Sequence, residues 1–107
     1  MPYLANSDLT KALTDSGVTI PTPTDEQLTS AVHNAGCRID MSVTAGKFTL
    51  PLATPYFSKL VQVATAIALW NLLFELRKST PTVKSNYEAA LKWLDGVALG
   101  NTSPITG

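Results

Sequence analysis

The chain has 107 residues, of which 45% are hydrophobic and 15% charged, and its eight basic and eight acidic side chains give a net charge of zero. This length fits a single domain, residues 1–107, and this composition argues against a disordered chain. Zero net charge argues against nucleic-acid binding that rests on neutralising phosphates. A surface this poor in charge predicts that partners cover part of it. The single cysteine, Cys37, excludes an internal disulfide, and the N-terminus lacks the basic-then-apolar pattern of a signal peptide.

Helix signals begin close to the N-terminus. The sequence predicts a first helix that starts with Asn6 or Ser7 as its N-cap and stops at Gly17. A second helix opens at Thr24, which forms a capping box with Gln27, and should end near residue 43. Its apolar residues recur at helical spacing, which predicts one buried face.

An apolar arm follows, from Ala45 to Pro55, between two helical segments. Pro51 and Pro55 push the residues before them toward extended geometry. Phe48, Leu50 and Leu52 alternate, so an extended arm carries all three on one side. Such an arm could form a short β pairing. It must bury these side chains either on its own bundle or on a neighbouring subunit, and the pattern does not distinguish the two.

The third helix should start with Thr54 as cap and Pro55 in its first turn, and run to about residue 79. It is apolar nearly all round, which predicts the central helix of the domain. The run 60–76 is too short and carries too many polar residues to predict a membrane span.

The fourth helix follows Thr80-Pro81 and should end at Gly100 as its C′ residue. Trp93 widens the edge of its apolar stripe. The stripe has these members: Val83, Tyr87, Ala90, Leu91, Leu94, Val97 and Ala98. Residues 101–107 form a polar tail without periodicity, which predicts flexibility unless the tail is bound. The predicted fold is therefore mainly α: a small four-helix domain, core about 6–100, with an extended arm between the second and third helices.

Few residues are candidates for catalysis or metal binding. His33 and Cys37 lie four apart on the second helix, with Asp40 three further on, so all three could approach one metal ion. No second His or Cys completes a structural zinc site, and no nucleophile–base pair or glycine-rich phosphate loop is evident. We therefore expect no enzyme activity, no cofactor and no metal. A metal-dependent enzyme stays open as an alternative that requires stoichiometric zinc in the purified protein.

Three sequence segments together resemble a known family. The first is Ala35-x-x-x-Ile39-Asp40, and the second is Gly46-Lys47-Phe48-x-Leu50-Pro51-Leu52. The third begins at Tyr87-Glu88-x-Ala90-Leu91-x-Trp93-Leu94 and closes at Gly100. In this order they resemble the small head–tail joining proteins of Mu-like tailed phages and prophages, over roughly residues 28–100. The chain departs from the family at Gly46-Lys47-Phe48, where Gly-Arg-Tyr is usual, and at Ala66 and Trp70 in the third helix, where an Asp and a Tyr are often found.

The resemblance implies a structural virion protein of the neck, assembled in the host bacterial cytoplasm. Such an adaptor forms a ring, dodecameric in the virion, between the portal protein and the stopper or tail-completion protein. Genomic DNA would pass through the channel without sequence-specific binding, and no membrane is involved. Lys47, Phe48, Leu50 and Leu52 are the expected interface residues. The tail is expected to dock on the portal through five residues: Asn101, Thr102, Ser103, Pro104 and Ile105.

A different function class stays open from the sequence. A small helical DNA-binding or regulatory protein of a prophage would also be short and mostly α. Its basic residues should gather on one recognition face, whereas here they are scattered along the chain. Tight duplex binding with a steep salt dependence would favour this alternative.

Overall fold

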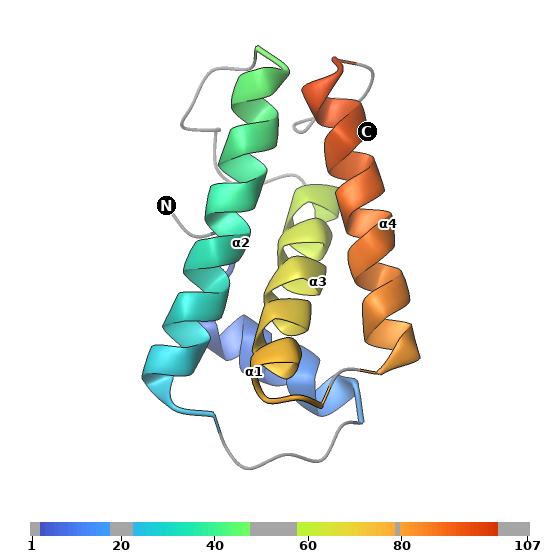
Figure 1. Cartoon of the computed structure of the whole chain (residues 1–107). Helices are drawn as coiled ribbons and strands as arrows, with labels where there is room; N and C mark the ends of the chain where they lie inside the picture. The colour runs from blue at the N-terminus through green and yellow to red at the C-terminus, as the bar shows by residue number, and fades with distance from the viewer. Residues whose placement is uncertain (1–2, 18–22, 48–57, 79, 101–107) are drawn as a thin grey trace.

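Four helices make up the fold. The computed structural model describes residues 3–17, 23–47, 58–78 and 80–100. It contains α1 (Asn6–Asp15), α2 (Asp25–Ala45), α3 (Ser58–Glu75) and α4 (Pro81–Ala98), and no strand within those residues (Figure 1). The mainly α prediction is confirmed, whereas the β pairing considered for the arm falls outside the described residues.

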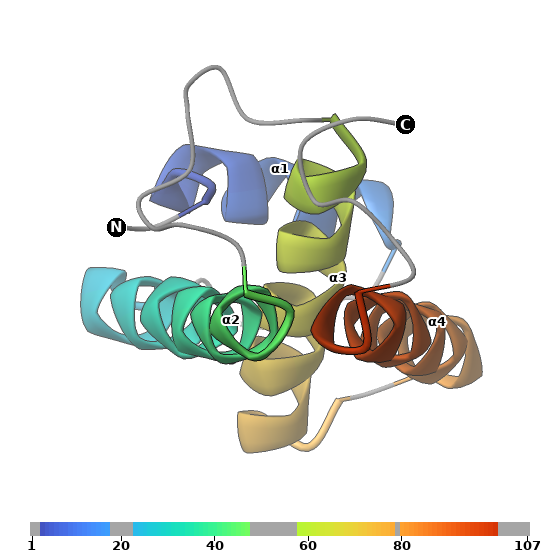
Figure 2. The ribbon, with the colours of Figure 1, turned by 90° about the horizontal axis from the view of Figure 1, so that it is seen from above.

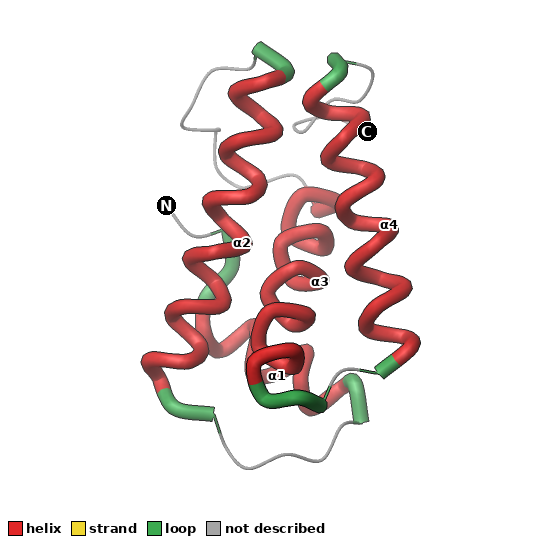
Figure 3. The backbone as a smooth tube through the Cα atoms, in the orientation of Figure 1, coloured by secondary structure: helices red, strands yellow, loops and turns green. Residues whose placement is uncertain are grey.

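The helices are arranged as a V with a third helix through it. α2 and α4 run in the same direction, lie far apart where they start and approach each other where they end (Figures 1 and 2). α3 runs in the opposite direction and passes between them, while α1 packs across α2 and α3. Figure 3 shows that short turns end the helices. Because it passes between α2 and α4 and also contacts α1, α3 is the central helix that its sequence predicts.

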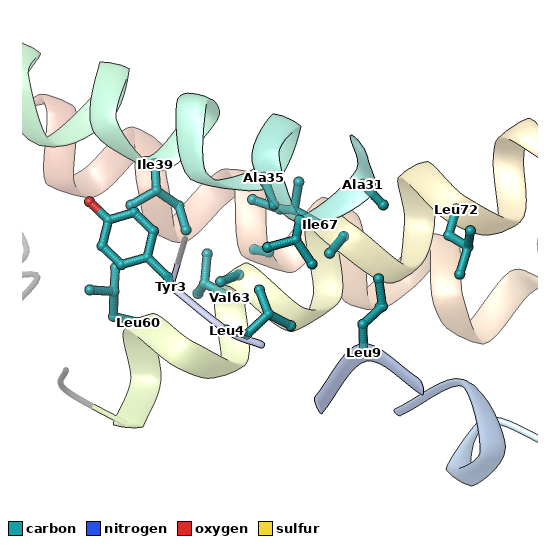
Figure 4. Packing of buried hydrophobic residues seen from close by; sticks show 14 of the residues in the cluster. Tyr3, Leu4, Leu9, Ala31, Ala35, Ile39, Leu60, Val63, Ile67 and Leu72 are labelled. Atoms are coloured by element: carbon teal, nitrogen blue, oxygen red, sulfur yellow. The ribbon is translucent and has the colours of Figure 1, made fainter. Parts of the chain in front are cut away.

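A continuous apolar core joins the four helices (Figure 4). Each helix contributes large side chains that are almost completely buried: Leu9, Ile39, Val43, Leu60, Leu72, Leu73, Leu94 and Val97. Leu91, expected in the buried stripe of α4, is instead only partly buried. α3 has a mainly apolar surface because it meets partners on several sides. No helix in the described part of the chain is both long and apolar enough to cross a bilayer.

Local side-chain hydrogen bonds fix the helix starts. The capping box of α2 is confirmed, because Thr24 Oγ1 accepts from the Gln27 amide at 3.1 Å and Gln27 Oε1 accepts from the Thr24 amide at 3.0 Å. The predicted cap of α1 is wrong by one residue. Ala5 is the N-cap, and Asp8 Oδ2 accepts its amide hydrogen at 3.0 Å. Asn6 is already helical and donates to Thr29 of α2 at 3.0 Å, so a tertiary contact draws it into the helix.

All four helices end at a residue with positive φ. Gly17 and Gly100 hold this position after α1 and α4, as predicted, with φ of 74° and 79°. Lys47 and Arg77 hold it after α2 and α3, with φ of 65° and 57°. Glycine is the usual residue here because it has no Cβ to clash. Two of the four helices therefore end in a conformation that their side chains disfavour.

The sequence predicts that the third helix ends at about residue 79, but α3 ends at Glu75. After Glu75, the Arg77 amide donates to the Phe74 carbonyl at 3.1 Å and the Lys78 amide to the Leu73 carbonyl at 2.8 Å. These are the two bonds of a Schellman motif. No glycine marks it, so the sequence carries no signal for this stop. α2 likewise runs two residues past the predicted end, to Ala45.

Substitutions at these helix ends should have opposite effects. We expect Gly17→Ala to lower the free energy of unfolding by about 1 kcal/mol, because alanine disfavours positive φ. A Cβ at Gly17 would meet nothing within 4 Å, so the cost is conformational. Arg77→Gly should raise stability by a few tenths to about 1 kcal/mol for the same reason. Urea unfolding measures both, and equal effects of one sign would contradict the assignment.

Candidate assembly surfaces

Of the predicted interface residues, Lys47 lies at one end of the bundle. Lys47 is exposed at the end of α2, beside the end of α4, where Leu99 is 76% exposed. Met41, about one turn before the end of α2, is 65% exposed. We call this end, with Met41, Lys47, Leu99 and Gly100, the apical end.

The predicted interface residues divide between the described part of the chain, which includes Lys47, and the rest. Phe48, Leu50 and Leu52, and the tail residues Asn101 to Ile105, lie outside the described part of the chain. The structure nevertheless shows where the two segments begin. Both the arm and the tail leave from the apical end, at Lys47 and Gly100. Lys47 and Gly100, far apart in the sequence, are thus brought to one end of the bundle.

A second exposed apolar surface lies on α3 and α4. Trp70 stacks on Tyr87, with ring centroids 5.0 Å apart and planes inclined by 15°. Phe74, which is 64% exposed, also contacts Trp70, and their ring centroids are 5.5 Å apart. We call these three residues the aromatic cluster. Tyr87, predicted in the apolar stripe of the fourth helix, and Trp70 are only partly buried and pack against the core.

A shallow groove also runs between α3 and α4. Its volume is about 410 Å³, and its lining includes Ala66, Leu69 and Ala90, with Gln62 and Asn86 among its polar residues. Small side chains at the helix contact leave this space open. It contains no histidine, cysteine or carboxylate, so its lining offers binding by shape and apolar contact.

The residues considered for metal chemistry line another hollow, beside α2. His33 Nε2 and Cys37 Sγ are 3.5 Å apart, and both side chains are exposed. Asp40 Oδ1 accepts a hydrogen bond from the hydroxyl of Tyr3, which ties the N-terminal segment to α2. Within the described residues no three metal-ligating side chains form a group that could hold a metal ion. Asp40 therefore has a structural contact with the N-terminal segment.

We expect Tyr3→Phe to lower the free energy of unfolding by about 1 kcal/mol, a typical net value for one hydrogen bond. The ring stays, so its apolar packing on the core is retained. Chemical unfolding followed by circular dichroism measures the loss. Tyr87→Phe is a suitable comparison because it also removes one hydroxyl, from a partly exposed tyrosine. A loss for Tyr3→Phe no larger than for Tyr87→Phe would contradict the role of the Asp40 contact.

Comparison with known proteins decides the family. Residues 3–106 match the model of a family described as Bacteriophage Mu, Gp36. The chain belongs to this phage family. A comparison with curated proteins gave no match. The match extends beyond residues 28–100, to which the sequence motifs point, and includes the N-terminal helix of this Gp36-family chain.

The aromatic cluster of this Gp36-family chain is the surface that sequence reasoning missed. Trp70 and Phe74 are four apart on α3, a spacing that brings side chains together on any helix. Because α3 is apolar all round, its pattern does not distinguish the side that faces the core from the side that faces outward. The crossing of α3 through the V decides this, and it is a tertiary feature.

Proposed function

We propose that this Gp36-family protein is a head–tail adaptor of the virion neck. In this role it forms a ring between the portal protein and the stopper or tail-completion protein and extends the DNA channel. The proposal agrees with membership of a phage family and with the sequence resemblance to head–tail joining proteins. It requires interfaces and no catalytic groups.

The observation that carries the proposal is the apical end. Met41 and Leu99 are large apolar side chains that are 65% and 76% exposed at the end where the arm and the tail begin. Exposed large apolar side chains are typical of surfaces that other proteins cover. A ring needs two different, complementary surfaces on each subunit. The apical end and the aromatic cluster are two such unlike surfaces.

The composition also agrees with a channel component. With zero net charge the protein would not hold DNA tightly, so a genome could pass. We expect purified protein to show no tight duplex binding at moderate salt. A gel-shift or anisotropy titration at several salt concentrations checks this, and a steep salt slope would favour the regulatory alternative.

The decisive test is removal of the gene from the phage or prophage that encodes it. Electron microscopy should then show DNA-filled heads that lose their genome or fail to join tails, and a plasmid copy should restore joined particles. The protein should also be detected in purified particles with antibody. Normal infectious particles without the protein would overturn the proposal.

A further inference from the structure

One face of α2 carries a histidine and a cysteine that take no part in the core. His33 and Cys37 are four apart on the helix, so their side chains lie on the same face, and both are exposed. The Nε2 atom of His33 is 3.5 Å from the Sγ atom of Cys37. Because Val32 and Ala35 are buried in the core, this part of α2 is a firm support for the two side chains.

The separation of the two atoms fits one metal ion bound to both. A zinc ion lies about 2.3 Å from a thiolate sulfur and about 2.0–2.1 Å from an imidazole nitrogen, so a tetrahedral angle between these bonds puts the two ligand atoms about 3.5 Å apart. The pair on α2 already has this separation. Thiolate and imidazole also suit zinc better than magnesium or calcium. A hydrogen bond between thiol and imidazole has a similar length, so only metal binding itself distinguishes the two.

A hollow beside the pair leaves room for an ion and its water. The N-terminal segment crosses α2 at two points, where Tyr3 donates to Asp40 and Asn6 donates to Thr29. Between these points lies a hollow of about 360 Å³, whose lining includes the histidine and the cysteine. One water molecule occupies about 30 Å³ in the liquid. An ion with two bound waters therefore fits.

The lining of this hollow also favours a cation. It includes the carboxylate of Asp40 and, within the described residues, neither a lysine nor an arginine. Because the Tyr3 hydroxyl already donates to Asp40, this carboxylate contributes negative charge near the ion and is not counted as a ligand. The described residues thus supply two ligands from one helix.

We propose that His33 Nε2 and Cys37 Sγ bind one Zn²⁺ ion on the exposed face of α2. The thiol releases its proton to the solvent and binds as thiolate, the imidazole binds in its neutral form, and water fills the two remaining positions. The sequence-based expectation of no metal rests on the lack of further ligands, which a closed site needs and an open site does not. Two protein ligands hold zinc less tightly than four, so the ion has to be supplied. The site involves no catalysis and does not depend on the adaptor role.

Titration of the purified full chain with Co²⁺ under reducing conditions tests the site, because a thiolate bound to cobalt absorbs in the near ultraviolet. The absorption should saturate at one ion per chain and disappear when Zn²⁺ displaces the cobalt. In a chain labelled with nitrogen-15 at histidine, zinc should shift the Nε2 resonance more than that of Nδ1. No absorption, saturation at one ion per two chains, or a larger shift at Nδ1 would overturn the proposal.

A variant that moves the histidine provides the matched control. His33→Ala combined with Ala45→His keeps the composition, and both positions are exposed. It places the imidazole eight residues from Cys37 (45 − 37), or about 12 Å along the helix, so one ion cannot bind both groups. This variant and Cys37→Ser should each weaken binding by at least about tenfold, because loss of even an outer-shell partner costs roughly 10–100-fold.

Circular dichroism should show both variants folded, since the substituted side chains are exposed. Unchanged affinity after the histidine is moved would mean that the cysteine alone binds the metal. Unchanged affinity in Cys37→Ser would mean that the metal binds elsewhere. Either result would overturn the proposed pair.

Discussion

Replacing Leu94 with alanine should lower the free energy of unfolding by about 2–5 kcal/mol, as for other buried leucines. Leu94 is fully buried on α4, in the core that α4 shares with α2 and α3. The loss combines the apolar area returned to water with the cavity that the shorter side chain leaves. For a domain of this size such a loss is a large share of the total stability.

Urea unfolding of three leucine variants tests this interpretation. Leu91→Ala, for which the sequence alone predicts the same loss, should cost less than Leu94→Ala because Leu91 is only partly buried. Leu99→Ala should change stability by less than about 0.5 kcal/mol, as is usual for exposed positions. A loss at Leu94 no greater than at Leu99 would show that α4 does not pack as described.

Leu50→Asp should leave a folded protein but abolish ring formation or attachment of the next virion layer. A carboxylate in an apolar contact would lose its hydration without gaining a partner, which costs several kcal/mol and breaks the contact. Complementation of a deletion strain measures the functional loss, and circular dichroism with thermal melting measures folding.

The arm itself offers a control. If the arm is extended, Thr49 faces the side opposite to Leu50, so Thr49→Asp should keep most of the ability to complement the deletion strain. Global unfolding of Leu50→Asp would mean that the arm belongs to the core of its own subunit. Loss of assembly in both variants would mean that any charge on the arm is harmful, so the side of the chain would not matter.

Local signals in the sequence predict much of the fold. Thr24 and Gln27 set the start of α2, α4 begins at Thr80-Pro81, and Gly17 and Gly100 end α1 and α4. These predictions hold because each depends on a few neighbouring residues. The central place of α3 also follows from its composition.

The sequence-based predictions are wrong at positions where tertiary contacts or a disfavoured backbone conformation determine the structure. Ala5 is the N-cap of α1 although its side chain cannot accept a hydrogen bond. Asp8 accepts the Ala5 amide hydrogen, and the hydrogen bond from Asn6 to Thr29 holds Asn6 inside the helix. Arg77 ends α3 in a conformation that composition does not predict. The exposed ring of Phe74 depends on how α3 crosses its neighbours, and no pattern within one helix contains that information.

The shared origin of the arm and the tail gives each subunit two unlike poles. One pole holds the ends of α2 and α4, with Lys47 and Gly100, and the other holds the end of α3, with Arg77. Copies joined with the apical end of one against the aromatic cluster of the next would be related by rotation about a single axis, so the two rims of the ring would differ. Such a ring can accept one neighbour on each rim, so the direction in which further layers are added would already be determined by the single chain.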